Sequence, residues 1–290
     1  MNSVETPSGK TATGENFPVG SRLIRADLRP HVHAFYGFAR TADDIADNPA
    51  LSAEEKLRRL DLMAAVLTGE VLEGSPAAAA MRADLAATGL APKNCLDLLV
   101  AFKMDATKSR YADWGELMGY CRYSAAPVGR QVLDLHGAPA AAYAPSDALC
   151  AALQVINHLQ DCAEDYRDLD RVYLPQADLT AMGAATADLG AAHASPALRR
   201  TLDLMLGRTE ALLVEGRGLP PAAGSLRLAC ETMAILTLAE RLTAMLRRRD
   251  PLAQRVKPSR AGFLATTLRG VWRGLWLTVP GQTTVVDKAR

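Results

Sequence analysis

Aromatic residues and strand signals are scarce in this chain of 290 residues. Phe, Trp and Tyr together make up 5% of the sequence, whereas alanine and leucine are abundant. Alanine and leucine lose little conformational entropy in a helix. The sequence also shows no convincing alternation of polar and apolar residues, which is the pattern of a half-buried strand. We therefore predict an all-α protein.

Other absences exclude several classes of function. The net charge is +1, so the overall charge gives no indication of a nucleic-acid partner. The five cysteines are widely spaced and form no CxxC pair, which is typical of reduced thiols and not of a disulfide framework or zinc site. No Gly-rich nucleotide-binding motif occurs. No apolar run is long enough to span a bilayer, and the N-terminus lacks a secretory signal. We expect a cytoplasmic protein.

Helix start and stop signals divide the chain into segments. Ser52 begins a capping box, and Pro127 interrupts a long periodic stretch. Helices are predicted over about 28–47, 52–69, 76–89, from 92, over 114–135 with a break at 125–127, from 146, from 196 and over 221–249, with a Gly/Ala-rich connection at 176–195. No composition break marks a second domain. We expect a disordered tail over 1–14, one helical domain over 15–258 and an amphipathic segment over 259–290.

Two acidic clusters share one spacing. Asp43 and Asp47 lie four residues apart, as do Asp161 and Asp165, so each pair projects from one face of its helix. Apolar residues at helical spacing precede both pairs, which brings the carboxylates next to a buried face. Carboxylates there are costly to desolvate unless a cation pairs with them. Brought together, the two faces could chelate hard divalent cations such as Mg²⁺, which could in turn hold a diphosphate.

The alternative interpretation of such a pair is a solvated helix face. The neighbouring residues argue against it. Arg40 lies on the helix face of Asp43, Gln154 and Asn157 share the face of Asp161, and Arg171 follows the second cluster closely. Arginines near clustered carboxylates suit a site that binds both metal and phosphate.

Four motifs resemble the squalene/phytoene synthase family of head-to-head prenyl transferases. They are residues 40–47 and 154–165, which match its two aspartate-rich motifs, residues 120–129 between them, and the Arg-x-Tyr-x-Pro run at 171–175. The motifs occur in the family order and are spread over most of residues 15–258. The resemblance implies a single-domain isoprenoid-synthase-type helical bundle with a central apolar cavity, a prenyl diphosphate substrate and Mg²⁺.

The resemblance also implies roles for individual residues. Metal binding is expected from Asp43, Asp47, Asp161 and Asp165, which would act in catalysis together with Tyr120 and Asn157. Substrate binding is expected from Arg40, Gln154, Arg171, Tyr173, Phe17, Ser124, Ala125 and Gln160.

Departures from the family pattern indicate one branch of the family. The segment 15–19 reads Glu-Asn-Phe-Pro-Val, Gln160 stands where the family usually has arginine, and Pro127 replaces a small or branched residue. This combination resembles the branch that acts in bacterial hopanoid synthesis, which converts presqualene diphosphate to hydroxysqualene. That branch works with a separate presqualene diphosphate synthase and a flavin-dependent, squalene-forming reductase. His158, Gln160 or Asn157 could orient the water that captures the cation.

Two alternatives remain open. Another member of the family would make presqualene diphosphate or squalene from farnesyl diphosphate. A non-catalytic relative with the same fold would serve as a binding or assembly protein, although both acidic clusters are intact here.

The C-terminal segment carries its own signal. Over residues 260–280 an apolar stripe that includes Trp272 and Trp276 alternates with arginines. This pattern fits a helix lying in a membrane interface, which would make the protein peripheral at the inner face of the membrane. It fits equally a helix docked on the protein's own surface.

Overall fold

The computed structural model describes residues 3–5 and 23–277. Within these residues the chain forms helices and no strand; a single isolated bridge joins Arg110 to Val172. The expected all-α fold is confirmed. Phe17, the segment 15–19 and most of the expected N-terminal tail lie outside the described residues.

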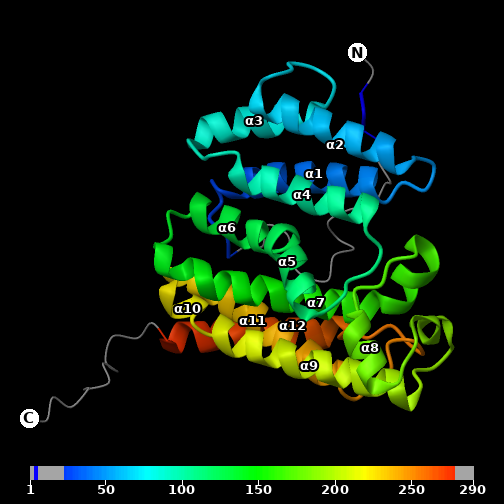
Figure 1. Ribbon diagram of the computed structural model, residues 1–290. Helices are drawn as coiled ribbons and strands as arrows, with labels where there is room; N and C mark the ends of the chain where they lie inside the picture. Colours follow the sequence, from blue (N-terminus) through cyan, green and yellow to red (C-terminus); the bar gives the residue numbers. More distant parts are fainter. Residues whose placement is uncertain (1–2, 6–22, 278–290) are drawn as a thin grey trace, which may run out of the picture.

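The helices form three layers, with α7 near the centre (Figure 1). The upper layer contains α1 (Arg29–Ala46), α2 (Ala53–Thr68), α3 (Pro76–Thr88) and α4 (Lys93–Thr107). The middle layer contains α5 (Trp114–Ser124), α6 (Ala126–Leu135) and α7 (Tyr143–Leu169). The lower part contains α8 (Gln176–Met182), α9 (Pro196–Gly216), α10 (Leu219–Ala222), α11 (Leu226–Leu246) and α12 (Arg260–Leu277).

Most helix boundaries follow the sequence signals. The Ser52 side chain accepts a hydrogen bond from the backbone N–H of Glu55 at 3.2 Å, and Pro127 lies in the first turn of α6. In that turn a backbone N–H would have no intrahelical partner in any case, so proline, which has no N–H, separates α5 from α6 at little cost.

Three boundary predictions are wrong. The helix α7 begins at Tyr143 and not at Ser146, because Pro145 is tolerated within its first turn. The helix predicted from Pro221 is split into α10 and α11, since Gly224 adopts a φ of 77° and Ser225 caps the new start at Leu226. The connection at 176–195 contains α8 and a 3₁₀ helix.

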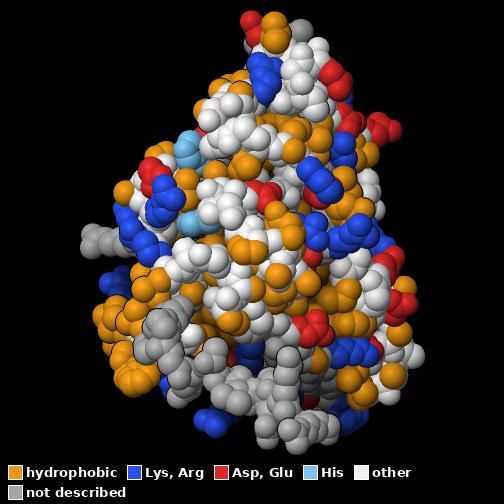
Figure 2. Space-filling view, turned by 90° about the vertical axis from the view of Figure 1, so that its left-hand side faces the viewer, with side chains coloured by type: hydrophobic (Ala, Val, Ile, Leu, Met, Phe, Trp, Pro, Cys, Tyr) orange, Lys and Arg blue, Asp and Glu red, His pale blue; other side chains and the backbone are white. Residues whose placement is uncertain are grey.

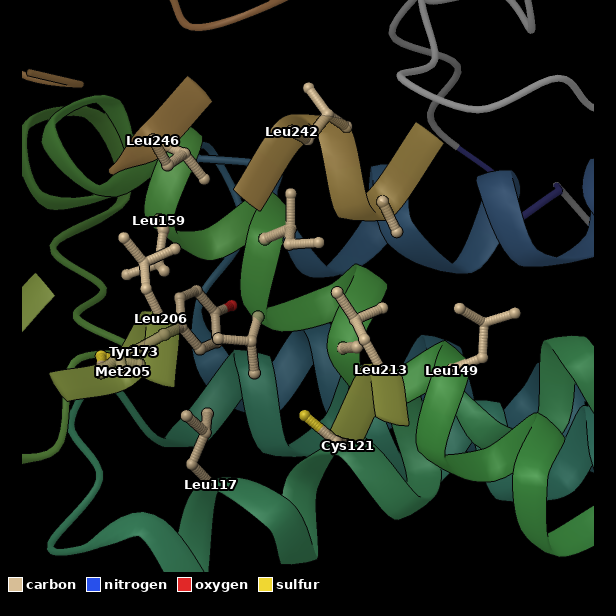
Figure 3. Packing of buried hydrophobic residues seen from close by; sticks show 14 of the residues in the cluster. Leu117, Cys121, Leu149, Leu159, Tyr173, Met205, Leu206, Leu213, Leu242 and Leu246 are labelled. Carbon is tan, nitrogen blue, oxygen red and sulfur yellow. The ribbon is translucent and has the colours of Figure 1, made fainter. Parts of the chain in front are cut away.

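Two hydrophobic clusters stabilise the layers. The smaller one is formed by the four helices α1, α2, α3 and α4, and it includes the fully buried Phe38, Ile45 and Met63. The larger one surrounds α7, where leucines and Met205 from α7, α9 and α11 converge near Tyr173 (Figure 3). The two acidic clusters lie at the ends of α1 and α7. The helix α1 contributes to the smaller hydrophobic cluster, and α7 contributes to the larger one.

Both ends of the described chain are held against the protein. Val4 is 5% exposed, and its N–H donates to the carbonyl of Gly74 at 2.9 Å, so Ser3–Glu5 do not form a free tail. At the other end, α12 runs along α11. Among the described residues, no helix combines the length and the hydrophobicity needed to cross a membrane.

Candidate active site

The ends of α1 and α7 meet through Arg171, which follows α7. Its guanidinium donates to the Asp47 carboxylate at 2.6 Å and to the Ala46 carbonyl at 3.1 Å, and its Nε donates to the Asp105 carbonyl at 3.1 Å. Arg171 is 7% exposed. The carbonyls at a helix C-terminus carry partial negative charge, so this arginine compensates both Asp47 and the end of α1.

A second arginine compensates the rest of the first cluster. Arg40 contacts Asp43 at 3.0 Å and Asp44 at 2.9 Å, and both contacts lie within α1. The side chain of Asp44 is nearly buried, at 7% exposure, so its charge needs such a partner. The sequence predicts Arg40 as a diphosphate ligand, and in the structure its guanidinium is held by these two carboxylates.

The second cluster has a different electrostatic environment. Burial, followed by the negative charge of Asp161, raises the pKa of Asp165 to about 8, and Asp47 and Asp105 act in the same direction. Arg171 opposes this rise in the pKa. Within the described structure, no Lys or Arg forms an ion pair with Asp165. The carboxylates at the ends of α1 and α7 therefore face one region, in which Asp165 is buried among other acidic groups.

Asp105, near the end of α4, joins the site, although no sequence motif predicted a role for it. Its carboxylate accepts hydrogen bonds from the hydroxyls of Tyr120 and Tyr173, both at 2.9 Å. Burial raises the pKa of Asp105 to about 6, while Arg171 and the two hydroxyls oppose the rise. Its position could have indicated this role, because Asp105 falls four residues after Ala101 and seven after Leu98, on the buried face of the helix.

Aromatic rings line the same region. The His158 ring stacks on Tyr173 with centroids 3.5 Å apart, and Tyr120 lies 5.5 Å from Tyr173. Tyr111 stacks on Tyr173, with ring centroids 5.6 Å apart, and is tilted against Tyr120. Burial, with a further contribution from Arg171, lowers the pKa of His158 to about 3, so this imidazole is neutral at physiological pH. The result is an uncharged, buried aromatic cluster next to the carboxylates.

The donor set matches the chemistry of Mg²⁺. Oxygen ligands from carboxylates are what this cation prefers, and the raised pKa of Asp165 reflects burial together with nearby negative charge, which a cation would offset. In the described residues, however, no three His, Cys, Asp or Glu side chains already form a ligand shell. Arg171 and Arg40 hold the three carboxylates of the first cluster, Asp43, Asp44 and Asp47.

The sequence matches the squalene/phytoene synthase family over residues 10–262. The chain belongs to this family. It is 50% identical over 252 residues to a hydroxysqualene synthase from Rhodopseudomonas palustris, covering 87% of this chain and 86% of the relative. It is 47% identical over 242 residues to a hydroxysqualene synthase from Sinorhizobium fredii, covering 83% and 82%. The crystal structure of squalene synthase HpnC from Alicyclobacillus acidocaldarius is similar at 36% identity and a TM-score of 0.70, covering 79% of this chain and 87% of that one.

Within this family fold, some predicted site residues lie beside the carboxylates. Tyr120, Tyr173 and Arg171 surround Asp105. The Gln154 amide lies 3.3 Å from the His158 ring nitrogen.

Gln160 has a different environment from the one expected. Its amide donates to the carbonyl of Val256 at 2.5 Å, and the residue is 6% exposed. Because consecutive helical residues are rotated by about 100°, its side chain leaves α7 in another direction from that of Asp161. Gln160 thus connects α7 to the segment between α11 and α12, and this contact gives no support to a role at the diphosphate.

The segment at the break between α5 and α6 is buried. Ala125 is 5% exposed, and the Ser124 hydroxyl is a buried group without a hydrogen-bond partner in the described structure. A substrate contact there stays a prediction. An apolar cavity beside the acidic clusters also stays a prediction. The cavity of about 500 Å³ found in the described structure lies elsewhere, between α11 and α12.

Proposed function

We propose that this protein is a hydroxysqualene synthase, which converts presqualene diphosphate and water to hydroxysqualene and diphosphate. The observation that carries the proposal is the meeting of the two acidic clusters around Arg171, in a chain 47–50% identical to relatives named for this activity. In this reaction the carbon–oxygen bond to the diphosphate breaks, the cyclopropylcarbinyl cation rearranges, and water forms a new carbon–oxygen bond with loss of a proton.

The carboxylates and arginines would act on the leaving group. Mg²⁺ bound by Asp43, Asp47, Asp161 and Asp165 would supply the positive charge that stabilises the departing diphosphate. Arg171 fixes the position of Asp47 and of the end of α1, so that one carboxylate of the first cluster is already oriented. Arg40 restrains Asp43 in the same way.

The aromatic cluster would protect the cation. Tyrosine faces attract positive charge, and a neutral His158 adds no repulsion. Since Tyr120 and Tyr173 donate their hydroxyl protons to Asp105, their oxygens can still accept a hydrogen bond from water. We assign to Asn157 and Gln154, on the site face of α7, the orientation of this water, and to Phe17, Ser124 and Ala125 contact with the isoprenoid chain.

We also propose pathway partners for this protein and its location in the cell. A presqualene diphosphate synthase would supply the substrate and a squalene-forming reductase would consume the product. Both compounds are water-insoluble, so we propose a cytoplasmic protein in peripheral contact with a membrane through residues 260–280.

Product analysis tests the function. Purified protein is incubated with Mg²⁺ and, in separate reactions, with presqualene diphosphate or farnesyl diphosphate, without a reductant, and the lipid products are identified by mass spectrometry. We expect hydroxysqualene from presqualene diphosphate. Presqualene diphosphate formed from farnesyl diphosphate would indicate another member of the family, and no turnover of either substrate would indicate a binding protein. Both outcomes would contradict the proposal.

A further inference from the structure

The helix α12 has an inner face that is fixed to the protein. A Cβ atom added to Gly270 would lie 2.5 Å from the Cα of Ala234, and one added to Gly274 would lie 2.8 Å from the Cα of Cys230. The backbones of α12 and α11 are therefore in close contact. Arg273 adds hydrogen bonds to Thr237 and to Glu240, at 2.9 and 3.0 Å. The helix α12 is therefore packed along α11, and it can present its outer face to a partner without detaching from the protein.

The outer face of α12 exposes large apolar side chains. We call the α12 ridge the set with helical spacing on this face, which consists of Leu264, Leu268, Trp272, Leu275 and Trp276. The two tryptophans are 61% and 63% exposed, and their rings meet edge to face with centroids 5.4 Å apart. In Figure 2, hydrophobic side chains gather at the lower left, at the level of α11 and α12. A contiguous exposed ridge of this kind marks an interaction surface.

A basic cavity borders the ridge. The cavity of about 500 Å³ between α11 and α12 is lined by three arginines, Arg241, Arg269 and Arg273, together with Glu240. The Glu240 charge is compensated, because its carboxylate accepts hydrogen bonds from Arg217 as well as Arg273. Within the described residues, Arg269 has no hydrogen bond or ion pair. It lies one helical turn from Trp272, so the cavity and the α12 ridge share an edge.

Charge decides between the possible occupants of this surface. The helix α12 contains three arginines and no acidic residue, and over 241–277 nine Lys and Arg residues accompany one Asp. A second copy of this chain would bring like charges together, whereas a bilayer with anionic headgroups is complementary to them. Tryptophans beside arginines are typical of helices that lie in the membrane interface.

We propose that α12 docks the protein on a membrane, with the α12 ridge entering the interface and the cavity at Arg269 binding the phosphate of an anionic lipid headgroup. This deepens the membrane contact included in the proposed function. The lipid test needs no catalysis, so either proposal can fail while the other stands.

Vesicle co-sedimentation of the full chain tests the proposal. One set of vesicles contains only phosphatidylcholine, and the other also contains phosphatidylglycerol. We expect binding to the anionic vesicles, and Trp272→Ala/Trp276→Ala should weaken it at least about tenfold. Arg269→Gln should weaken binding to the anionic vesicles about fivefold, with little change for the neutral ones. The matched controls are Leu72→Ala and Arg200→Gln, at exposed positions that are distant from α12 in the sequence.

The outcomes separate the two parts of the proposal. Equal binding of the tryptophan variant and the unchanged protein would overturn docking through the α12 ridge. Equal binding of Arg269→Gln to anionic vesicles would overturn the phosphate site. If the chain binds neither kind of vesicle and forms a dimer that the tryptophan substitutions dissociate, the α12 ridge contacts a second copy of the chain and the proposal fails. Thermal unfolding of each variant verifies that it is folded.

Discussion

The two acidic clusters have the same spacing and differ in how their charge is balanced. In α1 the chain supplies its own cations: Arg40 contacts Asp43 and Asp44, and Arg171 contacts Asp47. In α7 burial and Asp161 raise the pKa of Asp165 to about 8, and no arginine of the described structure pairs with Asp165. The first cluster is thus held in place by arginines, whereas Asp165 of the second is buried next to other acidic groups, whose charge a bound cation would offset. Two acidic pairs with the same spacing can therefore have different electrostatic environments.

The largest effect is expected from loss of an α7 carboxylate. Asp165→Asn should lower kcat about a thousandfold, because a ligand for the cation that stabilises the leaving diphosphate is removed. Glu164→Gln, at the exposed neighbouring position, is the matched control and should keep its activity. Steady-state turnover of presqualene diphosphate measures both. Near-normal activity of Asp165→Asn would remove the second cluster from the mechanism.

Stability without metal should separate the two clusters. Asp47→Asn leaves the buried Arg171 without its carboxylate and should reduce the free energy of unfolding by about 2 kcal/mol, less than for a fully buried pair because Asp47 is 24% exposed. Asp165, with a pKa of about 8, is mostly protonated near pH 7, so Asp165→Asn replaces a neutral carboxyl by an amide of similar size and should leave stability nearly unchanged or higher. Urea unfolding in EDTA provides the comparison. Equal losses in the two variants would show that the clusters do not differ.

The pH dependence of stability tests the role of Asp105. Its raised pKa, about 6, means that folding favours the protonated form, so its contribution to stability is present at low pH and is lost as the pH rises through about 6. Asparagine does not titrate. The melting temperature of the unchanged protein relative to Asp105→Asn should therefore fall between about pH 4 and pH 7. Asp97→Asn, on the same helix, is the control. A constant difference across this range would contradict the assigned environment of Asp105.

The smallest effect is expected at Gln160. Gln160→Met keeps the volume of the side chain and removes the hydrogen bond to Val256, which should cost about 1 kcal/mol of unfolding free energy. The product should still be hydroxysqualene, because the amide points to the protein backbone. Product analysis by mass spectrometry measures this. A new hydrocarbon product would show that Gln160 acts at the site of the reaction.

The sequence predicted the helices well where caps and prolines mark them. Ser52, Pro76 and Pro196 begin helices as expected, because their signals depend on local backbone hydrogen bonds. The start of α7 was misplaced because Ser146 is a good cap in isolation, whereas packing extends the helix to Tyr143. Local signals do not contain that information.

The site was predictable in part for the same reason. The spacing of the acidic pairs identifies the carboxylates, and Arg171 stands close to them in sequence. The contacts of Arg171 with Asp47 and Asp105 depend on how α1, α4 and α7 meet, which spacing alone cannot give. Asp105 is a single acidic residue without a motif, and Gln160 was interpreted by its neighbour in sequence, although helix rotation directs it elsewhere.

A thermal-shift titration with MgCl₂ and inorganic diphosphate tests most directly whether the α7 cluster needs an external cation. The unchanged protein should show a melting temperature that rises with ligand concentration, since binding to the folded state stabilises it. Asp165→Asn should begin at an equal or higher melting temperature and gain little. If Asp165→Asn gained as much as the unchanged protein, or started well below it, the account of the two clusters would be wrong.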